Sequence, residues 1–239
     1  MNNPHDSSAL QPVIVADTLG KTYTEGGLKT RVFEDLHLEV QQGETVAIVG
    51  PSGAGKSTLL HLLGGLDMPT VGEVRINGQV LSKLSDSARS RLRNQSLGVV
   101  YQFHHLLAEF TALENTMLPV LLSNYSVTES YDKAVRLLEA VDLGHRLHHK
   151  PSELSGGERQ RAAVARALVN DPSCVLGDEP TGNLDAMTAG KVFDTLLTLN
   201  RAKKTSLILV THDRQLAKRL DRVVELHQGR LRVLAHADV

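Results

Sequence analysis

The sequence predicts an α/β fold in which helices cover both faces of a parallel sheet, with a strand-rich N-terminal part and an inserted helical part. Beyond residue 157, helical and strand patterns alternate, which favours a parallel sheet. Candidate strands dominate the first third, whereas residues 85–157 are mostly helical in pattern. With 239 residues and 41% hydrophobic content, the chain can bury one sizeable core, so we expect a single domain over residues 1–239.

The N-terminal third contains several strand signals. Residues 13–23 and 31–40 are rich in β-branched and alternating apolar residues, and residues 44–50 form a continuous apolar run. Asn77 and Gly78 separate two alternating segments and predict a two-residue hairpin turn. Residues 1–12 are polar and lack the pattern of a signal peptide, so we expect a flexible tail there.

Helices are predicted from the middle of the chain onward. Residues 128–144 carry an apolar stripe that includes Tyr131 and Ala134, with Gly144 as the expected C-terminal cap. In the last third we expect helices at 157–171, 188–200 and 214–221, and strands at 174–178, 206–212, 222–229 and 230–235; a further helix is expected at 85–95.

Composition excludes several classes of protein. The chain has 26 Lys and Arg against 27 Asp and Glu, so it lacks the basic excess of a nucleic-acid binder. Cys174 is the only cysteine, which rules out an intrachain disulfide and fits a reducing compartment. No apolar run reaches the roughly 18 residues of a membrane-spanning helix, so we expect any membrane link to pass through a partner.

Residues 50–57, GPSGAGKS, predict a phosphate-binding loop between a strand and a helix. A flexible glycine turn has a similar composition, but in a phosphate-binding loop the amides point to one centre and the helix adds its positive N-terminal end. Lys56 would reach the β and γ phosphates, and Ser57 would offer its hydroxyl to Mg²⁺. The expected nucleotide-binding residues here are Gly50, Pro51, Ser52, Gly53, Ala54, Gly55, Lys56, Ser57 and Thr58.

Two adjacent acids end a later apolar strand, in CVLGDEP. One carboxylate would serve Mg²⁺ and the next would activate water. We therefore expect Asp178 on the metal side and Glu179 as the general base.

The stretch ELSGGERQR is the most discriminating motif. Ser155 and Glu158 form a capping box, and Gly156 and Gly157 leave bare amides that could bind an anion. LSGGE followed by RQR closely resembles the signature of ATP-binding-cassette (ABC) ATPases. The resemblance implies a P-loop NTPase with a RecA-like core, an N-terminal antiparallel β-subdomain and an α-helical subdomain inserted at about residues 85–157.

The resemblance implies further roles at matching positions, with ATP and Mg²⁺ as cofactors. Tyr23 is similar to the aromatic residue that stacks on adenine, and Gln102 to the glutamine that senses Mg²⁺ and the attacking water. Asp185 is similar to the dimer-loop acid, and His212 to the switch histidine at the γ-phosphate.

In this family two cassettes pack head to tail, which implies a homodimer in which residues 155–158 of one chain close over ATP held by the other. The resemblance is strongest to ATPases that release lipoproteins from the inner membrane towards a periplasmic carrier. It implies two integral membrane subunits that dock near Gln102 to Leu122, a lipoprotein contacted only indirectly, and a peripheral location on the cytoplasmic face of the bacterial inner membrane.

Two other classes of ABC ATPase stay open. One is a transmembrane regulator or exporter ATPase, which shares the DEPTGNLD stretch. The other is a soluble ABC ATPase of DNA repair or translation, which the sequence disfavours because it lacks a coiled-coil insertion, a zinc cluster and a basic excess. The pairs His104–His105 and His148–His149 have no metal-ligand spacing, so we expect no metal there.

Overall fold

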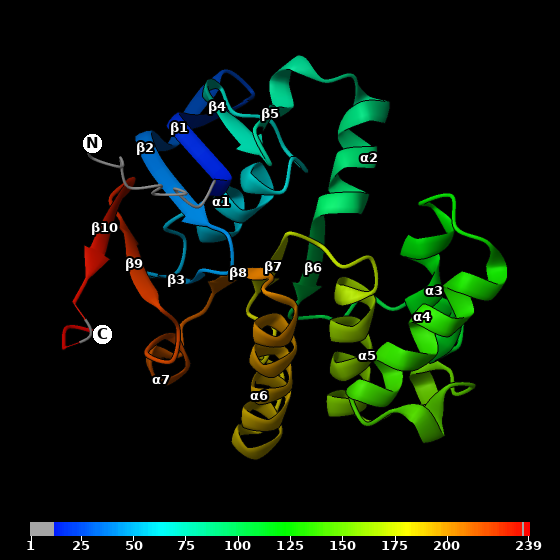
Figure 1. Ribbon diagram of the computed structural model, residues 1–239. Helices are drawn as coiled ribbons and strands as arrows, with labels where there is room; N and C mark the ends of the chain where they lie inside the picture. Colours follow the sequence, from blue (N-terminus) through cyan, green and yellow to red (C-terminus); the bar gives the residue numbers. More distant parts are fainter. Residues whose placement is uncertain (1–11, 236) are drawn as a thin grey trace, which may run out of the picture.

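A computed structural model describes residues 12–235 and 237–239, and Figure 1 shows the arrangement of the elements. The predicted tail, residues 1–12, lies outside the described residues except for Pro12. The described chain contains a four-stranded and a six-stranded sheet, together with the helices that cover them.

The four-stranded sheet is antiparallel, in the order β2-β1-β4-β5. Its strands are β1 (Pro12–Glu25), β2 (Leu28–Gln41), β4 (Val71–Ile76) and β5 (Gln79–Val80). Asn77 and Gly78 connect β4 to β5 with φ values of 48° and 77°, as a two-residue hairpin turn requires. The expected N-terminal antiparallel sheet and its hairpin are therefore confirmed.

The six-stranded sheet has the order β10-β9-β3-β8-β7-β6, and all its pairs are parallel except β10 with β9. Its strands are β3 (Thr45–Val49), β6 (Leu97–Tyr101), β7 (Cys174–Asp178), β8 (Ser206–Val210), β9 (Arg222–His227) and β10 (Arg230–Leu234). Every residue of β3 and β8 is buried, which explains why these strands are continuous apolar runs.

The α-helices are α1 (Lys56–Leu63), α2 (Asp86–Ser96), α3 (Ala112–Leu121), α4 (Val127–Ala140), α5 (Gly156–Leu168), α6 (Ala186–Lys203) and α7 (Arg214–Ala217). Helices α3, α4 and α5 pack on one another, and Figure 1 shows α3 and α4 at one end of the molecule. Strand β6 lies inside the 85–157 range expected as a helical insertion, yet it pairs with β7 in the core sheet. The continuous helical segment therefore starts after β6.

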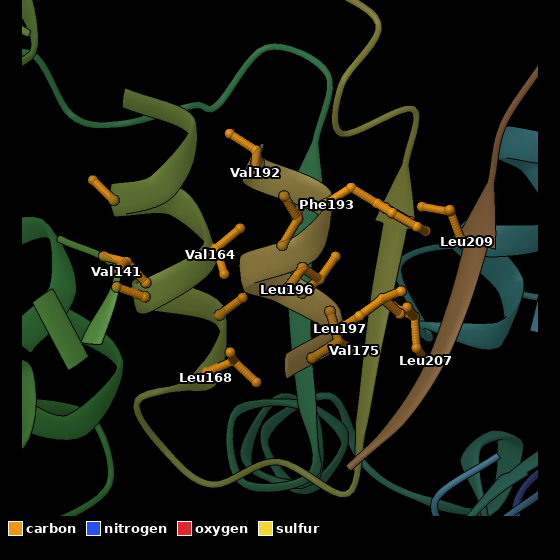
Figure 2. Packing of buried hydrophobic residues seen from close by; sticks show 14 of the residues in the cluster. Val141, Val164, Leu168, Val175, Val192, Phe193, Leu196, Leu197, Leu207 and Leu209 are labelled. Carbon is orange, nitrogen blue, oxygen red and sulfur yellow. The ribbon is translucent and has the colours of Figure 1, made fainter. Parts of the chain in front are cut away.

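Alternate residues of the parallel strands point to two separate cores. On β8, Leu207 and Leu209 belong to the core that also contains α5 and α6, whereas Ile208 and Val210 belong to the core that contains α1 and the antiparallel sheet. Figure 2 shows α6 between α5 and strands β7 and β8, with Phe193 among its core side chains. Helices α1 and α5 therefore cover opposite faces of the six-stranded sheet.

Candidate active site

The expected site residues gather at the carboxyl ends of four neighbouring parallel strands. The loop of residues 50–55 follows β3, Asp178 ends β7, Gln102 follows β6, and His212 lies two residues after β8. Because the carboxyl ends of parallel strands meet at one edge of a sheet, the topology places these side chains along a single edge.

The loop between β3 and α1 requires glycine at two close contacts. Gly50 has φ 146°, and a Cβ there would lie 2.3 Å from the carbonyl oxygen of Leu226 in β9. Gly55 caps α1 with φ 97°, and its Cβ would lie 2.3 Å from a methyl group of Val32 in β2. The loop is thus wedged between β9 and β2, in a shape that other residues could not adopt.

Lys56 is the first residue of α1, and its side chain folds back over the loop. The Lys56 Nζ donates to the carbonyl oxygens of Gly50 and Pro51, each at 2.9 Å. A Cβ at Gly53 would meet nothing within 4 Å, so the backbone there is open to a ligand. The geometry matches a loop that binds phosphate through backbone amides and one ammonium group.

Ser57 and Asp178, two of the three residues expected at Mg²⁺, are brought together; the third is Gln102. The Ser57 Oγ donates to Asp178 Oδ1 at 3.3 Å, although the residues are 121 positions apart. A hydroxyl and a carboxylate beside a phosphate site are oxygen donors of the kind that Mg²⁺ prefers. The donor set therefore fits the metal that the sequence predicts.

Glu179 and His212 are also neighbours. Glu179 has the left-handed φ of 46°, and its amide donates to Val210 O at 2.9 Å, which fixes this turn against the end of β8. The Glu179 Oε2 lies 2.9 Å from His212 Nδ1. The Glu179 side chain is 24% exposed and that of His212 is 68% exposed, so the pair lies where water and a ligand can reach it.

Gln102 reaches the same corner through Asn183, a residue that the sequence analysis missed. The Gln102 Nε2 donates to Asn183 Oδ1 at 3.0 Å. A Cβ at Gly182 would lie 2.9 Å from Gln102 Nε2 and 3.3 Å from Glu179 Oε2, so both side chains border Gly182. The only signal for Asn183 in the sequence is its place in the GNLD stretch, two positions before Asp185.

The signature residues form the N-terminus of α5. Ser155 caps the helix by accepting from the amide of Glu158 at 3.3 Å, and Glu158 Oε2 accepts from the amide of Ser155 at 2.7 Å. The hydrogen bonds that the Glu158 carboxylate accepts from the Ser155 amide and the Ser155 side chain, with a further one from Arg146, lower the pKa of Glu158 to about 2. The Glu158 carboxylate is thus engaged within its own chain, while Gly156 remains at the helix start.

Two further predicted residues have partners within the chain. Asp185 caps α6 by accepting from the amides of Met187 and Thr188 at 3.1 Å. Hydrogen bonds from the Thr188 side chain, the Thr188 amide and the Met187 amide lower the pKa of Asp185. A Cβ at Gly157 would lie 2.5 Å from the Thr188 methyl group. The start of α5 therefore packs closely on the start of α6.

Tyr23, the expected adenine-stacking residue, lies near the end of β1 with 43% exposure. Its hydroxyl donates to Asp67 Oδ2 at 2.9 Å, and Lys21 Nζ lies 4.7 Å from its ring centroid. Partial burial raises the pKa of Asp67, but hydrogen bonds from Lys21, the Met68 amide and Tyr23 outweigh it and lower the pKa. These contacts hold the ring in place, and its partial exposure leaves it accessible to a ligand.

The phosphate loop and the signature motif lie at the starts of helices that cover opposite faces of the six-stranded sheet. The loop leads into α1 on one face, and the signature motif begins α5 on the other face.

Within residues 12–235 and 237–239, no group of three or more His, Cys, Asp or Glu side chains could hold a metal ion. None of the helices in that part of the chain is long and apolar enough to cross a membrane.

Comparisons with known proteins agree with this geometry. The sequence model of the family described as "ABC transporter" matches residues 33–182. The chain is 68% identical over 240 residues to the lipoprotein-releasing system ATP-binding protein LolD of Xylella fastidiosa strain Temecula1, covering 100% of both chains. It is 70% identical over 227 residues to LolD of Xanthomonas oryzae pv. oryzae strain MAFF 311018, covering 95% of this chain and 93% of the relative.

Two solved structures of the ATP-binding cassette MJ0796 are similar in fold. A dimeric post-hydrolysis state bound to ADP and Pi has a TM-score of 0.85 at 36% identity, and a second dimeric structure has a TM-score of 0.86 at 37% identity. Each comparison covers 93% of this chain and 98% of the MJ0796 chain.

Proposed function

The chain belongs to the ABC transporter family as an ATP-hydrolysing cassette, and from that premise we propose that it is the motor subunit of a complex that releases lipoproteins from the inner membrane. The observation that carries the ATPase chemistry is the convergence of Lys56, Ser57 with Asp178, and Glu179 with His212 at one sheet edge. The sequence identity of 68–70% to LolD proteins, over nearly the full length of the chain, supports lipoprotein release over other transport tasks.

Glu179 is the proposed general base. Its carboxylate accepts a proton from water as the water oxygen attacks the γ-phosphorus, and the bond from that phosphorus to the β–γ bridging oxygen breaks, giving ADP and phosphate. His212, 2.9 Å from Glu179 Oε2, holds that carboxylate towards the γ-phosphate side. Gln102, which borders Glu179 at Gly182, orients the attacking water.

Mg²⁺ is the proposed metal, and when bound it would neutralise charge on the β and γ phosphates. Ser57 and Asp178 would hold it, because their oxygens lie 3.3 Å apart beside the phosphate loop, and Gln102 would complete the set from the neighbouring strand end. The loop amides and Lys56 would bind the phosphates, and Tyr23 would stack on adenine.

A head-to-tail homodimer completes the site in this proposal. Because α1 and α5 cover opposite faces of the sheet, we expect Ser155, Gly156 and Gly157 to close over the nucleotide of a second copy rather than over that of their own chain. The MJ0796 cassette, which is similar to this chain, is dimeric in both solved structures, and this supports a dimer here. ATP binding would then favour closure and hydrolysis would favour reopening, so the dimer would act as a ligand-biased switch.

The proposed membrane partners are two integral subunits of the LolC and LolE type, docked on the segment after Gln102. Three apolar side chains of this segment are solvent-exposed: Phe103 at 66%, Leu107 at 46% and Phe110 at 38%. Their clustering beyond Gln102 supports a docking surface for apolar helices. The cassette would thereby be held at the cytoplasmic face of the inner membrane.

A groove beside Leu122 lies at the other end of the proposed docking range. It has a volume of about 510 Å³, and its lining combines the apolar side chains of Leu66, Leu97, Val99 and Leu122 with the polar side chains of Ser90, Arg91, Arg93 and Asn94. Leu122 is 76% exposed and Leu66 is 50% exposed. Leu66, which follows α1, was not expected at a docking site, and it would connect the partner to the nucleotide-binding helix.

Phe103→Asp is expected to detach the membrane subunits and to leave ATP binding unchanged, because the charge is placed on an exposed apolar side chain outside the nucleotide site. Leu106 is a poorer target, since it packs against the core and its loss would also destabilise the fold. Co-purification from solubilised membranes measures the association. Val233→Asp on β10 is a matched control, because Val233 is also 66% exposed; equal retention of partners by both variants would place the docking surface elsewhere.

The test of the whole function is capture of the closed state. The Glu179→Gln chain with ATP is isolated from detergent-solubilised membranes, and mass spectrometry identifies the integral proteins that accompany it. Two related subunits with large periplasmic domains and bound lipoprotein are expected. A single subunit linked to cell-wall hydrolases would favour an FtsE-like regulator, and a single exporter subunit a MacB-like role; either result, or no membrane protein, would overturn lipoprotein release.

A further inference from the structure

Helix α5 makes three hydrogen bonds to residues 101–105, the segment that carries Gln102. The Gln160 Nε2 donates to Tyr101 O at 2.9 Å. The Arg166 Nη1 donates to His105 O at 2.7 Å, and its Nη2 donates to His104 O at 2.8 Å. The segment is therefore held on both sides of Gln102 by one helix.

The segment has a bent shape that depends on these anchors. His105 adopts the left-handed φ of 46°, which is unfavourable for a residue with a Cβ. Its ring lies edge-on to Tyr101, with the centroids 5.0 Å apart and the planes at 83°. The two ends of the segment thus lie close together, and Gln102 projects from the bend to Asn183.

The Arg166 guanidinium donates to these two carbonyl oxygens. Within the described part of the chain it forms no ion pair with a carboxylate. Its planar fork matches two successive carbonyl oxygens, which a lysine ammonium on its shorter, flexible stem would not bridge in the same way. Gln160 is 2% exposed, so its amide too is committed to the interior of the chain.

We propose that Arg166 and Gln160 are positioning residues for Gln102. They place the Gln102 side chain according to the position of α5. They lie six residues apart, about 9 Å along the helix, which suits them to hold the two ends of the segment. Because α5 begins with the signature motif, a shift of this helix on closure of the dimer would move Gln102 with it. The inference rests on the proposed ATPase mechanism and on the role of Gln102 in it.

The test is a double-mutant cycle on steady-state ATP hydrolysis by the full-length chain. Arg166→Lys is expected to lower kcat about tenfold while the Kd for ATP stays within about twofold, because a misplaced catalytic group costs turnover more than binding. Gln102→Ala is expected to lower kcat more, by about a hundredfold. Adding Arg166→Lys to Gln102→Ala is expected to cause no further loss, since the two residues act through one group.

Controls separate positioning from a purely structural role. Arg136→Lys on α4 is the matched control, because Arg136 is an exposed arginine on another helix, and it should retain full kcat. Gln160→Met keeps nearly the shape of the buried side chain but removes the donor to Tyr101, and should repeat the Arg166→Lys pattern. The Arg166→Lys and Gln160→Met chains should both unfold cooperatively and well above the assay temperature.

Three outcomes would overturn the proposal. Additive losses in the double variant would show that Arg166 does not act through Gln102. A fall in ATP affinity as large as the fall in kcat would indicate general loss of structure. Full activity of Gln102→Ala would show that Gln102 does not contribute to turnover, so that its position would not matter. None of these readouts requires a membrane partner, so a different transport substrate would leave the result unchanged.

Discussion

Glu179→Gln is expected to lower kcat for ATP hydrolysis by about two orders of magnitude or more, the scale of losing a positioned general base. The amide has the size of the carboxylate and can still hydrogen-bond His212, but it cannot accept the proton of the attacking water. ATP binding should persist, because Lys56 and the loop amides are unchanged. Single-turnover hydrolysis and equilibrium ATP binding measure the two effects separately.

The matched control is Glu139→Gln, an exposed glutamate on α4 that lies outside the site. It should retain normal turnover and binding. If Glu179→Gln turned over ATP at a near-normal rate, Glu179 would not be the base, and Asp178 would have to be reconsidered for both chemical roles.

Motifs that bind through local backbone geometry could be predicted from the sequence. The phosphate loop is one such case, because Gly50, Gly53 and Gly55 adopt positive φ values of 146°, 77° and 97°, which favour glycine over any residue with a Cβ. The acids at the end of β7 are another, since a buried apolar strand that ends in carboxylates places them at the sheet edge.

Contacts between distant segments could not be predicted in the same way. The hydrogen bonds from Gln160 and Arg166 to the segment around Gln102 depend on where α5 packs, and no local sequence pattern encodes that packing. The expected 85–157 boundary missed β6 because a five-residue strand after a helix carries a weak signal. Leu66 belongs to the docking groove only because α1 ends beside α2 and β6.

Two local expectations about α4 were wrong for physical reasons. Gly144 was expected to cap the helix, but α4 ends at Ala140 and Asp142 takes the left-handed φ of 58°. Aspartate tolerates that conformation because its side chain can hydrogen-bond locally. Tyr131 was expected on the buried stripe but is 43% exposed, and Ser130 is buried instead. The helix can bury the Ser130 hydroxyl because this hydroxyl donates to Ser126 O.

Lys56→Ala is expected to weaken ATP binding by roughly tenfold to a hundredfold, the cost of a hydrogen bond from a charged group to phosphate. The lysine also donates to Gly50 and Pro51 carbonyls, so its loss leaves the loop without two internal contacts. Titration calorimetry with ATP measures the change. Lys83→Ala, an exposed lysine in a short turn after β5, is the control and should bind normally; unchanged affinity in Lys56→Ala would refute the phosphate loop.

The same variant also tests whether the site is shared between two chains. Mixed with Ser155→Arg chains, Lys56→Ala chains should form heterodimers with one intact site, which joins the loop of the Ser155→Arg chain to the signature of the other. ATP-driven dimerisation should then recover in the mixture, although it is lost in each variant alone. Analytical ultracentrifugation with ATP measures it.

Ser155→Arg also removes a helix cap, at a cost of about 1 kcal/mol in the free energy of unfolding. Ser126 caps α4 with the same capping box, so Ser126→Arg reproduces that loss away from the signature motif. We expect Ser126→Arg to dimerise with ATP, which would assign the defect of Ser155→Arg to the composite site. If the mixture failed to dimerise while Ser126→Arg succeeded, the two chains would not pair head to tail, and the loop and the signature motif would belong to separate functions.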